Sequence, residues 1–209
     1  MFVMDSPSAP AVGHSDVQLD AARIGTLGGP ELVGGNALLR HTVEPGVSVE
    51  VDAGVLHVTD SSQYSDLDGY TGRLGVLLHS PDRHVALGAG LGGGLSPTAG
   101  GWGSADVHGV ISGAHRYIRP MLAGGIGYST PFGDRTFVVG NTTLQLPRNA
   151  IAQVHVGLEL GPPTAALILG LSMLHFWPGE DSVVNQTAGG SVPDEIFVAA
   201  GIGLRVAIN

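Results

Sequence analysis

Hydrophobic and polar residues alternate along most of this chain. In the segment that begins at Val47, for example, Val47, Val49 and Val51 alternate with Ser48 and Glu50. Because successive side chains of a β-strand point to opposite faces, this pattern predicts a strand with one aliphatic and one polar face. The alternation recurs in the segments 47–55, 71–79, 84–92, 104–112, 118–126, 152–160, 167–173 and 196–208.

Two weaker segments precede these eight. Val17, Leu19 and Ala21 alternate with polar or small residues, and Leu39 and Val43 flank a second stretch. With both included, the pattern predicts ten strands, an even number that puts both chain termini on the same side of the membrane, as in bacterial single-chain barrels. Eight strands are the alternative, in which residues 17–44 form a plug or a tail.

The connections between the segments alternate between short and long. The short ones are 44–46, 80–83, 114–117 and 161–163, and the long ones are 25–35, 59–69, 96–101, 129–149 and 178–194. Short turns on one side and long loops on the other are typical of up-and-down barrels that cross a bilayer. We therefore predict an all-β, transmembrane, up-and-down antiparallel β-barrel with short periplasmic turns and long extracellular loops.

The polar face is rich in glycine and carries charges of both signs, which suits a crowded interior better than a solvated exterior. We therefore expect the aliphatic face to point to lipid, in particular at Val154, Val156, Leu158, Leu169, Ile202 and Leu204. The polar face then lines the lumen, with a predicted charge network of Asp20, Arg40, Glu50, Asp52, Arg73, Asp106, His108, Arg119, His155, Glu159 and Arg205.

Charges inside a narrow barrel must pair, because an unpaired buried charge is very costly. We expect Arg73, Arg119 and Arg205 each to lie within ion-pair distance of a carboxylate of the network. A structural ion-pair plug is one interpretation of these charges, and a narrow conducting path is the other.

Most aromatic residues lie where a strand meets a long loop, which is where amphipathic rings meet lipid headgroups. The predicted girdle consists of Tyr70, Trp102, Tyr128, Phe176, Trp177 and Phe197.

Composition supports a membrane barrel and excludes other classes. Charged residues are only 13% of the 209 residues, whereas a soluble domain usually has about twice that share. The net charge of −9 argues against nucleic-acid binding, and the lack of cysteine excludes disulfides and thiolate metal sites. No apolar run is long enough for a membrane helix, so the chain can span a bilayer only as a closed barrel.

The N-terminal segment lacks the basic and long apolar regions of a secretion signal. We expect Met1 to be a misassigned start or a processed end, with residues 1–16 a disordered tail and residues 17–209 the barrel.

In these features the chain resembles the small outer-membrane β-barrels of Gram-negative bacteria. The resemblance covers Val17 to Asn209 and lies in the pattern, since the chain lacks the C-terminal aromatic residue that such proteins commonly have. It implies insertion in the bacterial outer membrane, with lipid as the surrounding partner and loops that could meet an extracellular ligand.

Candidate chemistry is sparse. The nine histidines show no metal-ligand spacing, and the GxGxxG match at residues 88–93 lies within an alternating strand and not before a helix, so we expect neither a metal nor a cofactor. Catalysis would need His175 or another histidine to meet a serine or a carboxylate at the loop-side rim. We therefore expect a non-enzymatic envelope-structural or surface-contact protein with a narrow or plugged polar lumen. The alternatives are a small-solute pore, a barrel-borne lipid hydrolase or protease, and a soluble lipocalin-like binding barrel.

Overall fold

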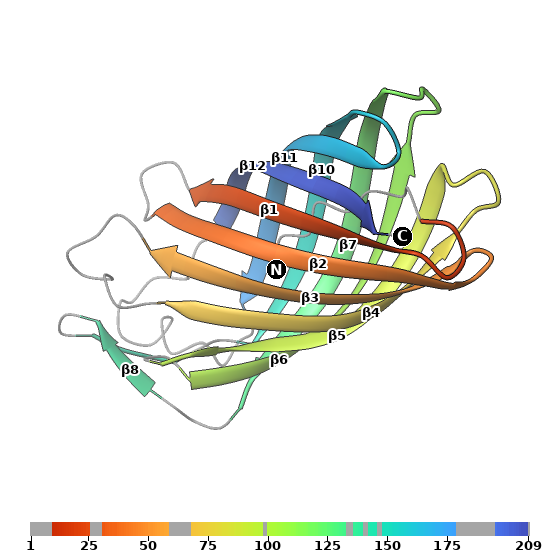
Figure 1. Cartoon of the computed structure of the whole chain (residues 1–209). Helices are drawn as coiled ribbons and strands as arrows, with labels where there is room; N and C mark the ends of the chain where they lie inside the picture. Colours follow the sequence, from red (N-terminus) through yellow and green to blue (C-terminus); the bar gives the residue numbers. More distant parts are fainter. Residues whose placement is uncertain are drawn as a thin grey trace.

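The protein forms a closed barrel of ten antiparallel β-strands (Figure 1). The computed structural model describes residues 10–25, 31–58, 68–97, 100–132, 136–139, 142–145, 148–178 and 195–208. The barrel strands are β1 (Ser15–Gly25), β2 (Glu31–Glu44), β3 (Val47–Val58), β4 (Gly69–His79), β5 (Val85–Ser96), β6 (Gly100–Ser112), β7 (Ile118–Pro131), β10 (Asn149–Leu160), β11 (Ala165–Pro178) and β12 (Glu195–Ile208). No helix in the described part of the chain is both long and apolar enough to cross a membrane.

Each barrel strand pairs with its neighbour in the chain, and β12 pairs with β1 to close the sheet. Ser15 of β1 lies opposite Ile208 of β12, so the first and the last strand residue lie at the same end of the barrel. This topology confirms the predicted up-and-down barrel of ten strands and rules out the eight-stranded alternative.

The short connections form tight turns at one end, called here the short-turn end. Between β2 and β3 only Pro45 and Gly46 intervene, and Gly46 has φ of 81°, a conformation in which other residues are strained. Arg83 adopts a left-handed φ of 58° in the turn between β4 and β5, where its N–H donates to the Ser80 carbonyl. The opposite end, which carries the other connections, is called the loop end.

Two of the predicted long connections are shorter than expected. β1 extends to Gly25 and β2 begins at Glu31, so residues 31–35 belong to a strand. Gly34 and Gly35 lie opposite Ala22 and Ala21, and this pairing needs only main-chain groups, which the hydrophobic pattern does not report. Similarly, only residues 97–99 separate β5 from β6.

The connection predicted at 129–149 contains structure of its own. β7 continues to Pro131, and a separate hairpin forms from β8 (Thr136–Val139) and β9 (Thr142–Gln145). Figure 1 shows β8 projecting beyond the barrel wall at the loop end. These strands are too short to show a convincing alternation in the sequence.

The barrel also begins slightly earlier than expected, since β1 includes Ser15 and Asp16. Residues 1–9 of the predicted tail, most of the connection at 59–69 and residues 179–194 lie outside the described residues.

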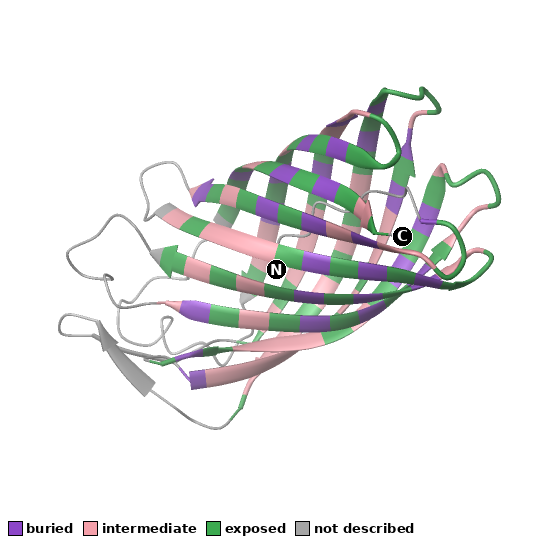
Figure 2. Cartoon of the chain, viewed as in Figure 1, coloured by how far each residue is buried: buried purple, intermediate pink, exposed green. Residues whose placement is uncertain are grey.

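Buried and exposed residues alternate along the strands (Figure 2), with the aliphatic residues on the outside. Val154, Val156, Leu169, Ile202 and Leu204 are all exposed on the outer wall, as predicted. Leu158 lies on the same outer face of its strand and is half-buried. A soluble binding barrel would bury these side chains, so the outward orientation argues against the lipocalin-like alternative.

The interior contains apolar residues: the alternation had assigned Met121 and Ala199 to the polar face, whereas Ile24, Ile168 and Leu174 were not assigned to either face. Ile24, Leu174 and Ala199 form a buried cluster at the loop end, against which Phe176 and Phe197 pack. Met121 and Ile168 form a second contact deeper in the barrel. The prediction of a polar interior was therefore incomplete, because alternation identifies a face but not every residue that fills it.

Candidate functional site: the charged interior of the barrel

A buried arginine–glutamate–arginine triad lies near the short-turn end. Glu159 on β10 accepts from Arg119 on β7, at 2.7 Å from Nη2 and 3.2 Å from Nε. The same carboxylate accepts from Nη2 and Nε of Arg205 on β12. Asp16 on β1 lies 3.7 Å from Arg205 Nη1. Glu159 is fully buried, so this cluster, called here the Glu159 triad, is shielded from water.

A second ion-pair cluster, the Arg73 cluster, crosses β2, β3, β4 and β6. Arg40 Nη2 lies 2.7 Å from Glu50 Oε1, and both side chains are fully buried. Arg73 donates to Glu50 and also holds Asp106 with two bonds of 2.7 and 2.8 Å. His108 Nδ1 lies 3.1 Å from the same Asp106 carboxylate.

Glycines on the inner wall make room for these polar side chains. A Cβ added at Gly90 would overlap the Arg73 guanidinium, and one at Gly88 would overlap the His108 ring. A Cβ added at Gly170 would likewise overlap the His155 ring. These three glycines therefore act as flat seats on which a side chain from a neighbouring strand lies.

The remaining predicted lumen residues also face inward. Asp20 accepts from Gln18 Nε2 at 2.9 and 3.0 Å, and Asp52 lies 3.9 Å from Arg73 Nη1. His155 Nδ1 lies 2.9 Å from the Ser172 hydroxyl. The structure thus places the predicted network of eleven residues inside the barrel and brings Arg73, Arg119 and Arg205 within ion-pair distance of carboxylates, as expected.

Sequence reasoning missed several members of the interior. Asp16 was placed in the tail and Gln18 was not assigned a role, although both continue the alternation that leads to Asp20. The Ser48 hydroxyl lies 3.0 Å from His79 Nε2. No feature of the sequence indicated this contact, because the two residues are far apart in the chain.

A cavity of about 110 Å³ lies against the inner wall formed by β6, β7 and β10. Its lining includes Arg73, Asp106 and His108 of the Arg73 cluster, together with Ser104, Ile151 and Gln153. The Asp106 side chain is 32% exposed, whereas that of Arg73 is 3% exposed, so Asp106 is the charged group that the cavity leaves accessible.

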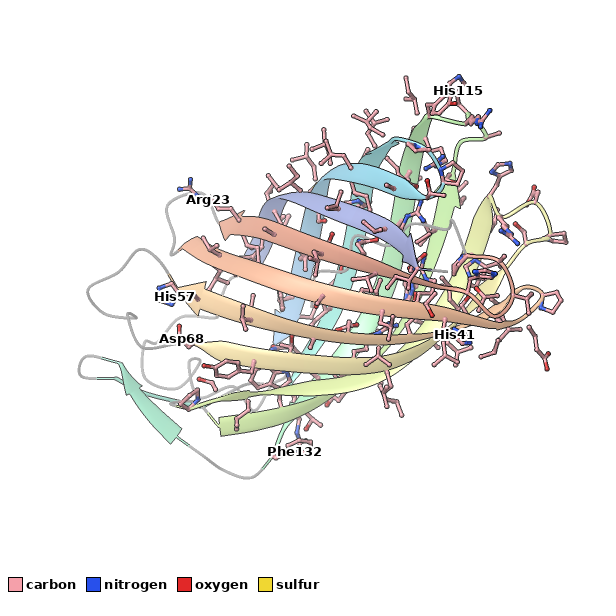
Figure 3. All side chains as sticks on the ribbon, viewed as in Figure 1. Arg23, His41, His57, Asp68, His115 and Phe132 are labelled. Atoms are coloured by element: carbon pink, nitrogen blue, oxygen red, sulfur yellow. The ribbon has the colours of Figure 1, made fainter. Side chains whose placement is uncertain are left out.

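Half of the predicted aromatic girdle is not on the outer surface. Tyr70, Tyr128 and Trp177 are exposed on the outside near the loop end, and Phe132, which was not predicted, joins them (Figure 3). Phe176 and Phe197 instead make an edge-to-face contact of 5.1 Å inside the barrel.

Trp102 is the third departure from the predicted girdle, because its ring lies over Gly94 on the inner face of the barrel. Position along a strand indicates distance from the membrane surface, but the parity of the residue decides whether it points in or out.

One histidine–carboxylate pair lies at the loop-side rim. His57 at the end of β3 lies 2.5 Å from Asp68 beside β4, and both side chains are largely exposed (Figure 3). In the described part of the chain, the hydrogen bond of the His57 ring is to the Asp68 carboxylate and not to a hydroxyl group, and no group of three potential metal ligands occurs. The histidine–hydroxyl pair of His155 and Ser172 is buried away from solvent.

The turn between β4 and β5 contains an acidic group with a shifted pKa. The Ser80 hydroxyl donates to the Asp82 carboxylate, and the His84 N–H donates to it at 3.3 Å. These bonds, together with attraction to His84, hold the pKa of Asp82 below its usual value.

Comparison with solved structures finds the same architecture in bacterial outer-membrane proteins. An outer membrane channel from Pseudomonas putida F1 aligns over 100% of both chains with a TM-score of 0.56 and 12% identity. The translocator domain of the autotransporter NalP from Neisseria meningitidis aligns over 92% of this chain and 87% of that domain, with a TM-score of 0.49 and 9% identity. Neisserial surface protein A aligns over 92% and 95%, with a TM-score of 0.46 and 10% identity.

Neither the protein-family models nor the curated protein sequences match this chain. At these levels of identity, the likeness to solved structures concerns the fold. Together with an exterior of exposed aliphatic residues and an interior of paired charges, the fold defines the class: the chain is a transmembrane β-barrel with the architecture of bacterial outer-membrane proteins.

Proposed function

We propose that this barrel is closed to solutes and acts in envelope structure or in contact with the surroundings of the cell. The observation that carries the proposal is the burial of the interior charges. Arg40, Glu50 and Glu159 are fully buried, and Asp16 and Arg205 are at most 2% exposed. A water-filled pore would leave the charges that line it in contact with solvent.

Two further features support a closed lumen. The Glu159 triad and the Arg73 cluster together join residues of β1, β2, β3, β4, β6, β7, β10 and β12, so they draw on most of the barrel wall. At the loop end, the apolar cluster of Ile24, Leu174 and Ala199 fills the interior beside β1, β11 and β12. Ions would have to break buried ion pairs to pass, which is costly in a region of low dielectric constant.

In this proposal the barrel serves as a membrane anchor and the loop end meets the outside. The hairpin of β8 and β9 and the exposed His57–Asp68 pair lie at that end and are available for contact. The surrounding lipid is the partner of the outer wall.

Conductance across a planar bilayer tests the proposal. Protein refolded into lipid should give no unitary current steps, and protease protection of the same vesicles should show that it has inserted. A double variant, Glu159→Ala with Arg205→Ala, removes part of the triad and serves as a matched comparison that should raise the current. Stepwise, voltage-proportional currents from the unaltered protein would contradict the closed lumen and favour the small-solute pore.

A further inference from the structure

The cavity beside the Arg73 cluster differs from the rest of the interior because one of its charged groups is accessible. Asp106 is 32% exposed on its side chain, while the residues deeper in the barrel, such as Met121 and Val110, are buried. Water therefore reaches Asp106 from the loop end and not from the short-turn end.

The Asp106 carboxylate retains capacity for a further hydrogen bond. It accepts two bonds from Arg73 and one contact from His108 Nδ1. An ionised carboxylate has about four acceptor positions, so one position remains for a donor in the cavity.

The charge of the Arg73 cluster, with the adjacent Asp52 included, is not balanced. Two guanidinium groups, of Arg40 and Arg73, face three carboxylates, of Glu50, Asp52 and Asp106. With His108 neutral, one negative charge is in excess, and Asp106 is the carboxylate of the three that the cavity exposes. The cavity therefore favours a cation over an anion.

The rest of the lining sets the size and character of a ligand. Ile151, Ala123 and Gly125 contribute an apolar wall, while Ser104 and Gln153 add neutral polar groups. Since an enclosed apolar cavity of about 150 Å³ holds benzene, a space of about 110 Å³ fits a slightly smaller molecule.

From these observations we propose that the cavity is a binding site for a small primary ammonium ion with a short branched or linear alkyl group. Its ammonium donates to Asp106, and its alkyl group packs on Ile151 and Ala123. The site opens toward the loop end, so the ligand enters from outside the cell. This inference goes beyond the closed lumen proposed above, because a cavity with one entrance binds a ligand without passing it.

Isobutylammonium is a suitable probe, with isobutanol as a neutral compound of the same shape and isobutyrate as an anion. Binding to protein in lipid nanodiscs is followed by the ¹³C shift of the Ile151 δ-methyl group, with empty nanodiscs as the blank. The titration is made at pH 8, above the range in which histidine normally becomes protonated. We expect isobutylammonium to bind at least about tenfold more tightly than isobutanol, and isobutyrate not to bind.

Two variants and one control distinguish a loss of binding at the cavity from a general effect on the barrel. Asp106→Asn should weaken isobutylammonium binding by about tenfold or more, since it removes the charged acceptor. Ala123→Leu should abolish binding by filling the cavity, and it leaves the ion pairs in place. Asp20→Asn removes an interior carboxylate outside this cavity and should change the affinity by less than about twofold.

Several results would overturn the proposal: equal binding of isobutanol and isobutylammonium, unchanged affinity in Asp106→Asn, or no shift at Ile151 with any probe. If Asp106→Asn fails to refold, persistence of binding in Ala123→Leu would still refute the site. A conducting barrel that nevertheless binds isobutylammonium through Asp106 would contradict only the closed lumen, so the two proposals fail separately.

Discussion

Replacement of Glu159 by glutamine tests whether the interior of the barrel is dry. Glu159 is fully buried and accepts four bonds, two from Arg119 and two from Arg205. The amide is the same size as the carboxylate but carries no charge, so Glu159→Gln leaves two buried guanidinium groups without their shared counter-ion. Removing one partner of a buried ion pair typically costs about 3–5 kcal/mol.

Other acceptors in the structure place the expected cost at the lower end of that range. Arg119 Nη1 also donates to the Arg116 carbonyl at 2.7 Å, and Arg205 Nη1 donates to the Pro163 carbonyl at 3.3 Å. Asp16 also lies near Arg205. These contacts remain in the variant, so we expect Glu159→Gln to lower the free energy of unfolding by about 3 kcal/mol.

Urea-dependent folding into lipid vesicles measures this change. Folded and unfolded protein are separated by their heat-modifiable electrophoretic mobility, and the fluorescence of the two tryptophans gives a second probe. Glu44→Gln, at an exposed carboxylate at the end of β2, is a matched control that should change stability by less than about 0.5 kcal/mol.

A triple variant distinguishes a dry triad from a hydrated one. When Glu159→Leu is combined with Arg119→Met and Arg205→Met, the whole triad is replaced by apolar side chains and Asp16 keeps Arg40 as a nearby charge, so stability should recover most of the loss seen in Glu159→Gln. A loss below about 1 kcal/mol for Glu159→Gln alone would mean that water already solvates the triad, and the closed lumen would then be wrong.

The two remaining predictions concern a glycine seat and a turn. Gly170→Ala should destabilise the barrel by about 1–3 kcal/mol in the same urea experiment, because its Cβ would overlap the buried His155 ring. Gly124→Ala is the control, since the nearest atom to a Cβ added there is the Gln153 carbonyl oxygen at 3.7 Å. An equal loss of stability at both positions would contradict the role of Gly170 in making room for the His155 ring. Asp82 should titrate below its usual pKa of 3.8 in an NMR titration, because the charged form accepts from Ser80 and His84, and Ser80→Ala should raise that pKa. Since the folded-state pKa is depressed, the stabilising contribution of Asp82 is complete above 3.8 and is lost as the pH falls through the lower value; a pKa at or above 3.8 would contradict the bonding in this turn.

Much of the fold follows from local features of the sequence. Alternation with period two is a property of each strand by itself, so it identified the barrel strands, their number and the face of most residues in them. Residues such as Val156 and Glu159 were assigned to opposite walls from parity alone, and the structure places them there. The inward arginines could also be expected to pair, because a buried charge without a partner is too costly to persist.

Only the tertiary structure decided which residues meet. Glu159 pairs with Arg119 and Arg205, and Arg73 pairs with Asp106, because strand register and barrel closure bring these distant residues together. The seats at Gly88, Gly90 and Gly170, the inward rings of Phe176 and Phe197, and the cavity beside Asp106 have the same origin. Sequence alternation indicates whether a residue faces the lumen or the lipid. Its neighbours across the barrel depend on the registers of all ten strands together.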